Sequence, residues 1–570
     1  MQASRVRSHV AKSRSLALFL LTIGLLGCKP QMVGIVGDDD QGLVDAGDPT
    51  GPDDLAAPPL PPKIPGCVGD CVVNATCSAD KGPTTLSGTV SIPSGLLPVY
   101  NARVFIPTGE EIPGPPQAGA YCDRCDRTPK VFSTTTDING KFTLRNIPAG
   151  RNMPLVIQVG KWRRVLSISE VSECSVNLLD PAETRLPRSR VEGNIPKMAL
   201  STGSADALEC LLRSRKLGLD DSEFTPESGP GRVNLYAGAT GAAQYVSTLN
   251  GGARFTASLA QPNPSWWDSY DNWAKYDIVM LSCEGQQYMQ YKSQTALQNL
   301  EKYVGNGGRV FASHWHNGWI ANAKAPQKIQ TVATFPNSGA PGTVTAKINL
   351  NYVRGAALAE WLVLPTVWGA GNPPARGDLP LAGAKNTIGT TAAALTQTWV
   401  TYNDVPQYFS FNAPIGASAS QQCGQMVFTD LHVSSGAGGG DTSARDKPFP
   451  TGCTAGALSA QEKALIFMLF EGDRYAAPPW AIGALSFCLA ITVGTVWEIF
   501  EFGMDMLFGF NMMKSGLPDT MGDLIVNAIG AALAAGAAVL PAFSMSSASL
   551  ALRSGGGGTR LSTPREPKVL

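Results

Sequence analysis

The chain has 570 residues, a formal net charge of zero and only 16% charged residues. This length exceeds that of one ordinary domain and predicts several domains. The 44% share of apolar residues is enough to build a large core. The balanced charge argues against a nucleic-acid-binding protein, because it implies no basic surface, so we expect no nucleic-acid partner.

The N-terminus has the pattern of an export signal. Residues 1–14 carry four basic residues and no acid, and residues 16–26 form an apolar stretch that is too short to span a bilayer. The sequence LLGC that ends at Cys28 resembles the lipobox of bacterial lipoproteins, in which this cysteine becomes the lipidated N-terminus. An ordinary signal peptide that contains a cysteine is the alternative. We therefore predict a signal peptide over residues 1–28 and a membrane-anchored body outside the cytoplasm, in a bacterial cell envelope.

Residues 29–82 are rich in Asp and Pro, which predicts a disordered tether that contains a cysteine cluster. Without Cys28 and Cys488 the chain has an even number of cysteines, which in an exported protein predicts disulfides rather than zinc ligands. Their pairing cannot be derived from spacing. They are Cys67, Cys71, Cys77, Cys122, Cys125, Cys174, Cys210, Cys283, Cys423 and Cys453.

Residues 83–188 alternate as short strands separated by turn residues, which predicts an all-β sandwich. Asn139-Gly140 is typical of a hairpin turn. The segments SGTV, NARVFIP and TDINGKFTLRNIPAG resemble the carboxypeptidase regulatory-like, or transthyretin-like, domain. The resemblance implies a small accessory sandwich without catalytic residues.

Residues 190–475 alternate between apolar strands and helices, which predicts an α/β domain with a flavodoxin-like parallel sheet. The run YDIVMLSCEG, followed by LQNLEKYVGNGGRVFASHWH, resembles the class I glutamine-amidotransferase-like superfamily and its ThuA-like branch. In amidotransferases the nucleophilic cysteine follows the strand that here ends at Ser313, but this chain has His314 there. The resemblance therefore implies the fold and not the catalytic triad. An insertion near residues 335–420 is expected to contain a short helix over residues 356–364. The rest, around residues 368–380, is expected to be loop and to cover the carboxyl edge of the sheet.

The histidines His314, His316 and His432 all follow predicted strands, and Asp430 lies two residues before His432. Two or three histidines with a carboxylate are typical ligands of a divalent metal, and histidines also serve in acid–base chemistry. The sequence thus predicts a divalent-metal site. A second interpretation is a set of hydrogen-bonded polar groups without activity.

Cys283 and Glu284 end the neighbouring predicted strand. Together with His314 they are the candidate catalytic residues. A disulfide-bonded or simply buried Cys283 is the alternative.

Near the C-terminus, residues 478–548 contain two uncharged stretches, each long enough to span a bilayer, and residues 549–570 are expected to be disordered. We therefore predict a transmembrane helical hairpin. The segments WEIFEF and LPDTMGDL resemble the last two helices of an uncharacterised VanZ-like inner-membrane family, which implies a topology but no activity. Acids at membrane depth usually face a bundle interior or water. The acids between the two stretches are Glu498, Glu501, Asp505, Asp519 and Asp523.

Taken together, these patterns predict a membrane-associated envelope lipoprotein that acts as a non-catalytic binding or scaffold protein. The expected partners are membrane lipid and a surface glycan or protein. One alternative is a metal-dependent hydrolase that acts on a carbohydrate or peptide through His314, His316 and His432. The other is a structural membrane component.

Overall fold

A computed structural model describes 63–68, 71, 77–78, 80–122, 132–213, 215–258, 265–336, 338–432, 440–470, 479–509 and 524–531. The predicted signal peptide with Cys28, most of the tether, Cys125, Asp519, Asp523 and the C-terminal tail lie outside the described residues. Every element below belongs to one compact unit, Pro61–Leu570.

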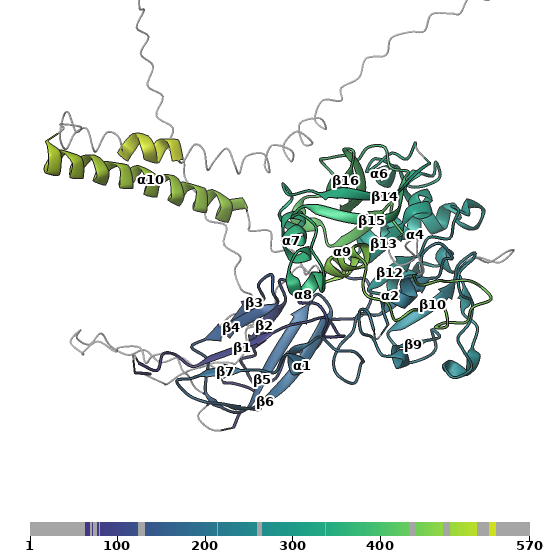
Figure 1. Ribbon diagram of the computed structural model, residues 1–570, viewed down its shortest axis with the longest axis horizontal. Coiled ribbons are helices and arrows are strands. Elements are labelled where there is room, and N and C mark those ends of the chain that lie inside the picture. Colours follow the sequence, from purple (N-terminus) through teal and green to yellow (C-terminus); the bar gives the residue numbers. More distant parts are fainter. Residues whose placement is uncertain are drawn as a thin grey trace, which may run out of the picture. The chain divides into compact units, whose positions relative to one another are not determined.

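The first part of this unit consists of two small sheets (Figure 1). One has the order β4-β1-β7 and the other β3-β2-β5-β6. Leu86 and Phe142 from the first sheet share one core with Val104, Leu155 and Ile157 from the second, as expected for a β-sandwich. The strands are β1 (Thr85–Thr89), β2 (Arg103–Ile106), β3 (Phe132–Thr135), β4 (Lys141–Arg145), β5 (Gly150–Val159), β6 (Trp162–Val171) and β7 (Val176–Leu178). The short helix α1 (Pro181–Thr184) follows them.

The Asn139-Gly140 turn does not close a hairpin, so that prediction is wrong. The strands on either side of it, β3 and β4, belong to different sheets. The Asp137 carboxylate accepts hydrogen bonds from the Asn139 and Lys141 amides at 2.9 and 2.8 Å. Gly140 has a φ of 72°, which glycine adopts without strain. The turn therefore carries the chain from one sheet to the other.

The second part is built on an eleven-stranded sheet with the order β11-β10-β8-β12-β13-β18-β17-β16-β14-β15, and β9 pairs with β10. The strands from β11 to β18 in this order are parallel. Taken in chain order, β8, β10, β12, β13 and β18 lie as 2-1-3-4-5, which is a common order in doubly wound sheets. The bounds are β8 (Met198–Ser201), β9 (Phe224–Thr225), β10 (Val233–Ala237), β11 (Thr256–Ala257), β12 (Ile278–Leu281), β13 (Arg309–Ser313) and β18 (Gly424–Thr429).

Both faces of this sheet are covered. In β12, Val279 and Leu281 belong to one buried cluster, whereas Ile278 and Met280 belong to the other. Residues of α4 lie in the first cluster, and residues of α2, α7 and α9 lie in the second. This explains why β12 is apolar throughout. The helices are α2 (Leu208–Leu211), α3 (Tyr270–Ala274), α4 (Gln294–Gly305), α5 (Gly318–Ala321), α6 (Gln327–Gln330), α7 (Val353–Leu362), α8 (Pro365–Trp368) and α9 (Ala460–Leu469).

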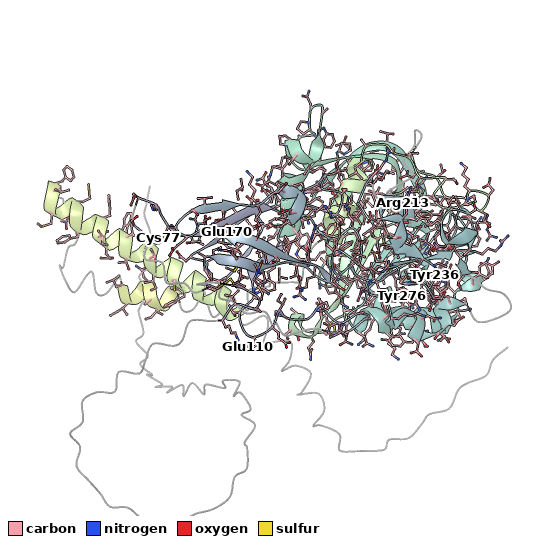
Figure 2. All side chains as sticks on the ribbon, turned by 90° about the horizontal axis from the view of Figure 1, so that it is seen from below. Cys77, Glu110, Glu170, Arg213, Tyr236 and Tyr276 are labelled. Atoms are coloured by element: carbon pink, nitrogen blue, oxygen red, sulfur yellow. A yellow bond between two sulfur atoms is a disulfide. The ribbon has the colours of Figure 1, made fainter. Side chains whose placement is uncertain are left out.

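Aromatic side chains fill much of the first cluster. The hydroxyl oxygens of Tyr236 and Tyr276, both labelled in Figure 2, lie 2.7 Å apart. Trp267, Trp273 and Trp319 pack against one another and are buried. These tryptophans therefore form core and are not exposed for stacking on a glycan.

The insertion near residues 335–420 contains the predicted short helix as α7, but much of the rest is strand, so the prediction of loop is wrong there. It forms α7, α8 and four strands that extend the sheet in antiparallel fashion beyond β18. In β15, the buried residues Leu379 and Leu381 alternate with less buried neighbours. Nearby Pro and Gly residues partly obscure this strand pattern in the sequence. The strands are β14 (Gly339–Ile348), β15 (Asp378–Asn386), β16 (Thr396–Tyr402) and β17 (Val405–Ala413).

The prediction that the body contains disulfides is confirmed. Cys283 is free and buried, and Cys488 is free and exposed. The bonded pairs among the described residues are Cys67–Cys71, Cys77–Cys174, Cys122–Cys423 and Cys210–Cys453.

Polar contacts join the sandwich to the α/β part. Asp277, which precedes β12, accepts a hydrogen bond from the Gly119 amide at 2.8 Å and forms an ion pair with Lys161 at 2.5 Å. The Trp361 indole donates to the Pro98 carbonyl at 3.0 Å. The two parts therefore share buried polar contacts as well as a disulfide.

The C-terminal region contains α10 (Pro479–Phe508) and a helical segment at 524–531. A Cβ atom at Gly494 would lie 2.6 Å from the Asn527 amide nitrogen, so the two segments approach each other closely at this point. Glu498 is buried, and Glu501 accepts a hydrogen bond from the Trp497 indole at 2.8 Å.

Among the helices that the structure describes, none is long and apolar enough to cross a membrane. The predicted transmembrane hairpin is therefore not found in this part of the chain. The last turns of α10 carry Glu498, Glu501 and Asp505, and carboxylates at membrane depth are energetically costly.

Candidate metal centre

Three neighbouring parallel strands, β12, β13 and β18, each deliver one side chain to the carboxyl edge of the sheet. The register pairs Leu281 with Ala312, which places Cys283 at the level of His314 just beyond the strands. His432 follows the end of β18 by three residues. Ligands of doubly wound sheets bind at this edge.

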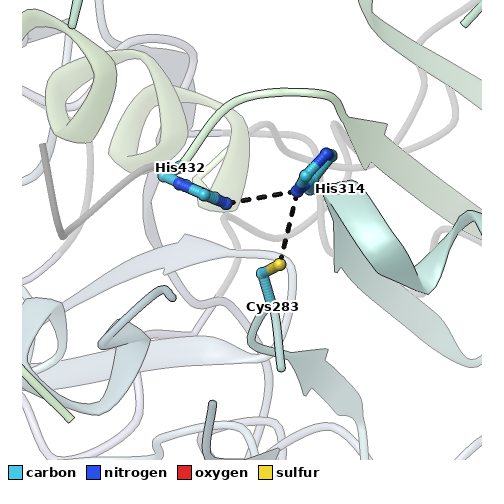
Figure 3. Close-up of side chains that lie close together, drawn as sticks. All are labelled: Cys283, His314 and His432. Atoms are coloured by element: carbon cyan, nitrogen blue, oxygen red, sulfur yellow. Dashed lines mark hydrogen bonds between the residues drawn. The ribbon is translucent and has the colours of Figure 1, made fainter. Parts of the chain in front are cut away.

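The three side chains point toward one another (Figure 3). The Cys283 sulfur lies 3.5 Å from Nδ1 of His314, and Nε2 of His432 lies 3.3 Å from the same nitrogen. All three candidate ligand atoms are within 4.8 Å of one another. His314 is thus the central member of the cluster.

The two distances to Nδ1 of His314 match those between ligands of one metal ion. Metal bonds of about 2.0–2.1 Å to nitrogen and about 2.3 Å to sulfur, at tetrahedral angles, separate the ligand atoms by roughly 3.3–3.7 Å. The two close pairs measure 3.3 and 3.5 Å. One thiolate with two imidazoles suits Zn²⁺ and related transition metals.

Burial keeps both imidazoles neutral and able to offer a lone pair. It lowers the pKa of His314 to about 3, with further contributions from His432 and Lys385. Burial, followed by the charge of Lys385, lowers the pKa of His432 to about 4. Neutral imidazole is the form that binds a metal.

Burial shifts the pKa of the Cys283 thiol in the opposite direction. Burial raises the pKa of Cys283 to about 12, although the backbone amides of Trp315 and Gly285 favour its charged form. Such a thiol is a weak nucleophile at neutral pH. A bound metal ion would replace the proton and hold the sulfur as thiolate.

His314 has a φ of 44°, in the left-handed region. This conformation ends β13 and starts a 3₁₀ turn over His314–Asn317. Histidine is among the non-glycine residues enriched in this region, yet the conformation still has an energetic cost. The cost is consistent with a position that the surrounding structure holds for function.

His316 does not join the cluster. Its Nε2 atom donates to the Ser282 carbonyl at 2.8 Å, and its Nδ1 atom accepts from the Trp319 indole at 3.1 Å. Because both ring nitrogens are engaged, His316 supports the chain next to Cys283 instead of binding a metal.

Asp430 is also placed elsewhere, although the sequence predicts it as a ligand. Its carboxylate accepts from the Thr387 hydroxyl at 2.6 Å and from the Ile388 amide at 3.1 Å. It is fully buried, and burial raises its pKa. These contacts tie the end of β18 to the end of β15.

Glu284, a candidate catalytic residue, has structural partners as well. Its carboxylate accepts from the Ala239 amide at 2.9 Å and lies 3.3 Å from the Lys292 ammonium. Both side chains of this ion pair are 1% exposed. Glu284 therefore anchors loops beside the cluster.

Sequence reasoning did not identify Cys283 as a metal ligand. Its position directly after a strand, like that of His314, was the available signal. It also missed Gln461, whose amide nitrogen donates to the His432 carbonyl at 2.9 Å. No local pattern around Gln461 predicts this contact, because α9 lies far from the strands in sequence.

Residues 454–541 match the family described as "Predicted membrane protein (DUF2238)". The matched segment begins before α9 and extends past α10. It covers less than a sixth of the chain's 570 residues. This match indicates a membrane association and no specific activity. No curated protein matches the chain.

Proposed function

We propose that this is a membrane-associated binding protein that holds one transition-metal ion between Cys283, His314 and His432. The observation that carries the proposal is the placement of a thiol and two neutral imidazoles at metal-ligand separations. Each ligand comes from a different strand end, so only the folded sheet brings them together.

The proposal includes location in the bacterial cell envelope, with an anchor at Cys28 and the body outside the cytoplasm. The four disulfides among the described residues support an oxidising compartment. The match to a predicted membrane protein family supports the membrane association. Membrane lipid is then a partner.

The proposal also takes residues 83–188 as a carboxypeptidase regulatory-like domain and residues 190–475 as a flavodoxin-like, amidotransferase-like domain. The 2-1-3-4-5 strand order supports the second assignment. The left-handed turn at His314 supports it too, since amidotransferases place a residue on a sharp turn after the corresponding strand.

A metal-dependent hydrolase is the second candidate, because the cluster supplies three ligands among the described residues. Catalytic zinc sites commonly use three protein ligands and one water molecule. This version uses Cys283, His314 and His432, and His316 has no part in it.

The test measures metal content and the Co²⁺ spectrum of the full-length protein, prepared under mild reduction that spares the disulfides. We expect equimolar metal and a sulfur-to-cobalt charge-transfer band in the parent protein. Cys283→Ser should remove the band, and His314→Ala and His432→Ala should remove stoichiometric metal.

Two matched variants serve as controls. Cys488→Ser removes a free cysteine outside the cluster, and His316→Gln alters a buried imidazole outside the cluster; both should keep the metal. Equal metal content in the parent, Cys283→Ser and His314→Ala proteins would refute the proposal. Glycoside or peptide hydrolysis that needs the loaded metal would select the hydrolase version.

A further inference from the structure

Two ties, which are hydrogen-bonded links to residues 430–432, flank Lys385 in the sequence. They hold this part of the chain beside the metal cluster. Gln461 bridges the Ala382 and His432 carbonyls with hydrogen bonds of 2.9 Å each. Beyond Lys385, the Thr387 hydroxyl donates a hydrogen bond to the Asp430 carboxylate at 2.6 Å. The end of β15 therefore runs alongside 430–432, with Lys385 between the two ties.

The charge of Lys385 acts on the cluster. Burial is the main cause of the low pKa of both histidines, and the positive charge of Lys385 lowers the pKa of His314 and of His432 further. The same charge acts on the Asp430 carboxylate. The backbone ties and these electrostatic effects agree on where Lys385 lies.

Lys385 differs from three other shielded lysines of the chain. Lys216 and Lys292 are buried, Lys161 is largely buried, and each forms an ion pair with a carboxylate. In the described ranges of the chain, by contrast, the half-buried Lys385 has no ion pair and no hydrogen bond from its ammonium. A shielded cation without a carboxylate is costly unless a ligand supplies the opposite charge.

The position of Lys385 suits an anionic ligand. The Asp430 carboxylate beside it is already engaged by Thr387 and Ile388. Lys385 lies at the edge of the sheet where the ligands of such folds bind.

We propose that the metal centre binds an oxyanion, the carboxylate or phosphate group of a small ligand, with one oxygen on the metal and another on the Lys385 ammonium. This inference rests on the proposed metal site and names the class of ligand that the site takes. A protein with three metal ligands leaves a position for such an oxygen. Ion pairing to a carboxylate or phosphate is the usual role of a lysine in an anion site.

The experiment follows the visible spectrum of the Co²⁺-loaded full-length protein while inorganic phosphate or acetate is added. The parent protein should show saturable spectral change with at least one of these probes, and the two titrations distinguish phosphate from carboxylate ligands. Lys385→Met should lower the affinity for the anion roughly tenfold or more, because one charge-assisted contact is lost. Lys385→Arg should restore most of the binding. The control is Lys324→Met at an exposed lysine, which should bind as the parent does.

Cobalt affinity separates this role from a structural one. Loss of a positive charge beside the metal should leave Co²⁺ affinity unchanged or raise it, whereas damage to the fold would lower both affinities. Equal anion affinity in the parent and Lys385→Met proteins, or no anion effect on the parent spectrum, would overturn the inference while leaving the metal site intact. Failure of the parent to bind Co²⁺ would instead remove the proposed function, and this inference with it.

Discussion

Two buried polar clusters in the α/β part differ in the charges and contacts of their side chains. In the first, the Lys216 ammonium contacts the carboxylates of Asp441 and Glu462, and these side chains are at most 5% exposed. Asp441 also accepts from the Thr454 amide at 2.6 Å. In the second, the neutral side chains of Cys283, His314 and His432 face one another.

The comparison shows how to tell a structural cluster from a binding site. The Lys216 cluster balances much of its charge within the chain, so its contacts are complete in the folded protein. The metal cluster directs three lone pairs at a common region, and only a group from outside can use all of them. Mutations in the first cluster should therefore change stability, and mutations in the second should change binding.

The largest effect is expected for Lys216→Met. This change leaves Asp441 and Glu462 buried without their cation, which should lower the free energy of unfolding by about 3–5 kcal/mol. Denaturant unfolding of the full-length protein measures it. Co²⁺ binding by the folded fraction should persist.

The matched control is Lys347→Met, because the Lys347–Asp378 pair lies at the surface, with 69% of the lysine side chain exposed. Its loss should cost less than about 1 kcal/mol. Similar losses for the two lysine variants would show that the Lys216 cluster does not differ from a surface ion pair.

An intermediate effect is expected for Glu209→Gln, which should stabilise the folded protein. Burial raises the pKa of Glu209 to about 7, and the charges of Asp206 and Asp441 add to this, while Ser443 opposes it. The second carboxyl oxygen of Glu209 has no hydrogen-bond partner among the described residues.

The unfolded chain ionises this carboxyl near its ordinary value of 4.5. Stability from Glu209 is therefore fully present below that pH and is lost as pH rises to about 7. Gln mimics the protonated acid, so the variant should gain roughly 1–3 kcal/mol at pH 8 and little at pH 4. Unfolding curves across this range measure it, and an identical pH profile in both proteins would contradict it.

The smallest effect is expected for Asp430→Asn, which tests whether this residue belongs with the ligands. The amide cannot accept all the hydrogen bonds from Thr387 and Ile388, so unfolding should become easier by about 1–2 kcal/mol. Metal should still bind at one ion per chain when Co²⁺ is in excess. Loss of bound metal equal to that of His432→Ala would place Asp430 among the ligands instead.

Much of the parallel sheet is predictable because the composition of each strand indicates how deeply it is buried. Ile278–Leu281 is apolar throughout, since both faces of β12 are covered. The antiparallel extension was not predicted, because the pairing of β17 with β18 is a long-range contact and Pro406 interrupts the local strand pattern. The hairpin prediction at Asn139-Gly140 was wrong for a related reason. The local sequence favours a turn there but does not indicate which sheet the next strand joins.

By itself, the sequence determined which residues end the parallel strands and therefore which polar side chains reach the carboxyl edge of the sheet. Strand burial and strand ends depend on local composition, which is why Cys283, His314, His316, Asp430 and His432 could all be named. Only the tertiary structure decided which of them face one another. Rotation of the chain after each strand, such as the left-handed turn at His314, directs one imidazole into the cluster and the next toward Ser282 and Trp319. That direction depends on packing from distant segments, and no spacing rule along the chain contains it.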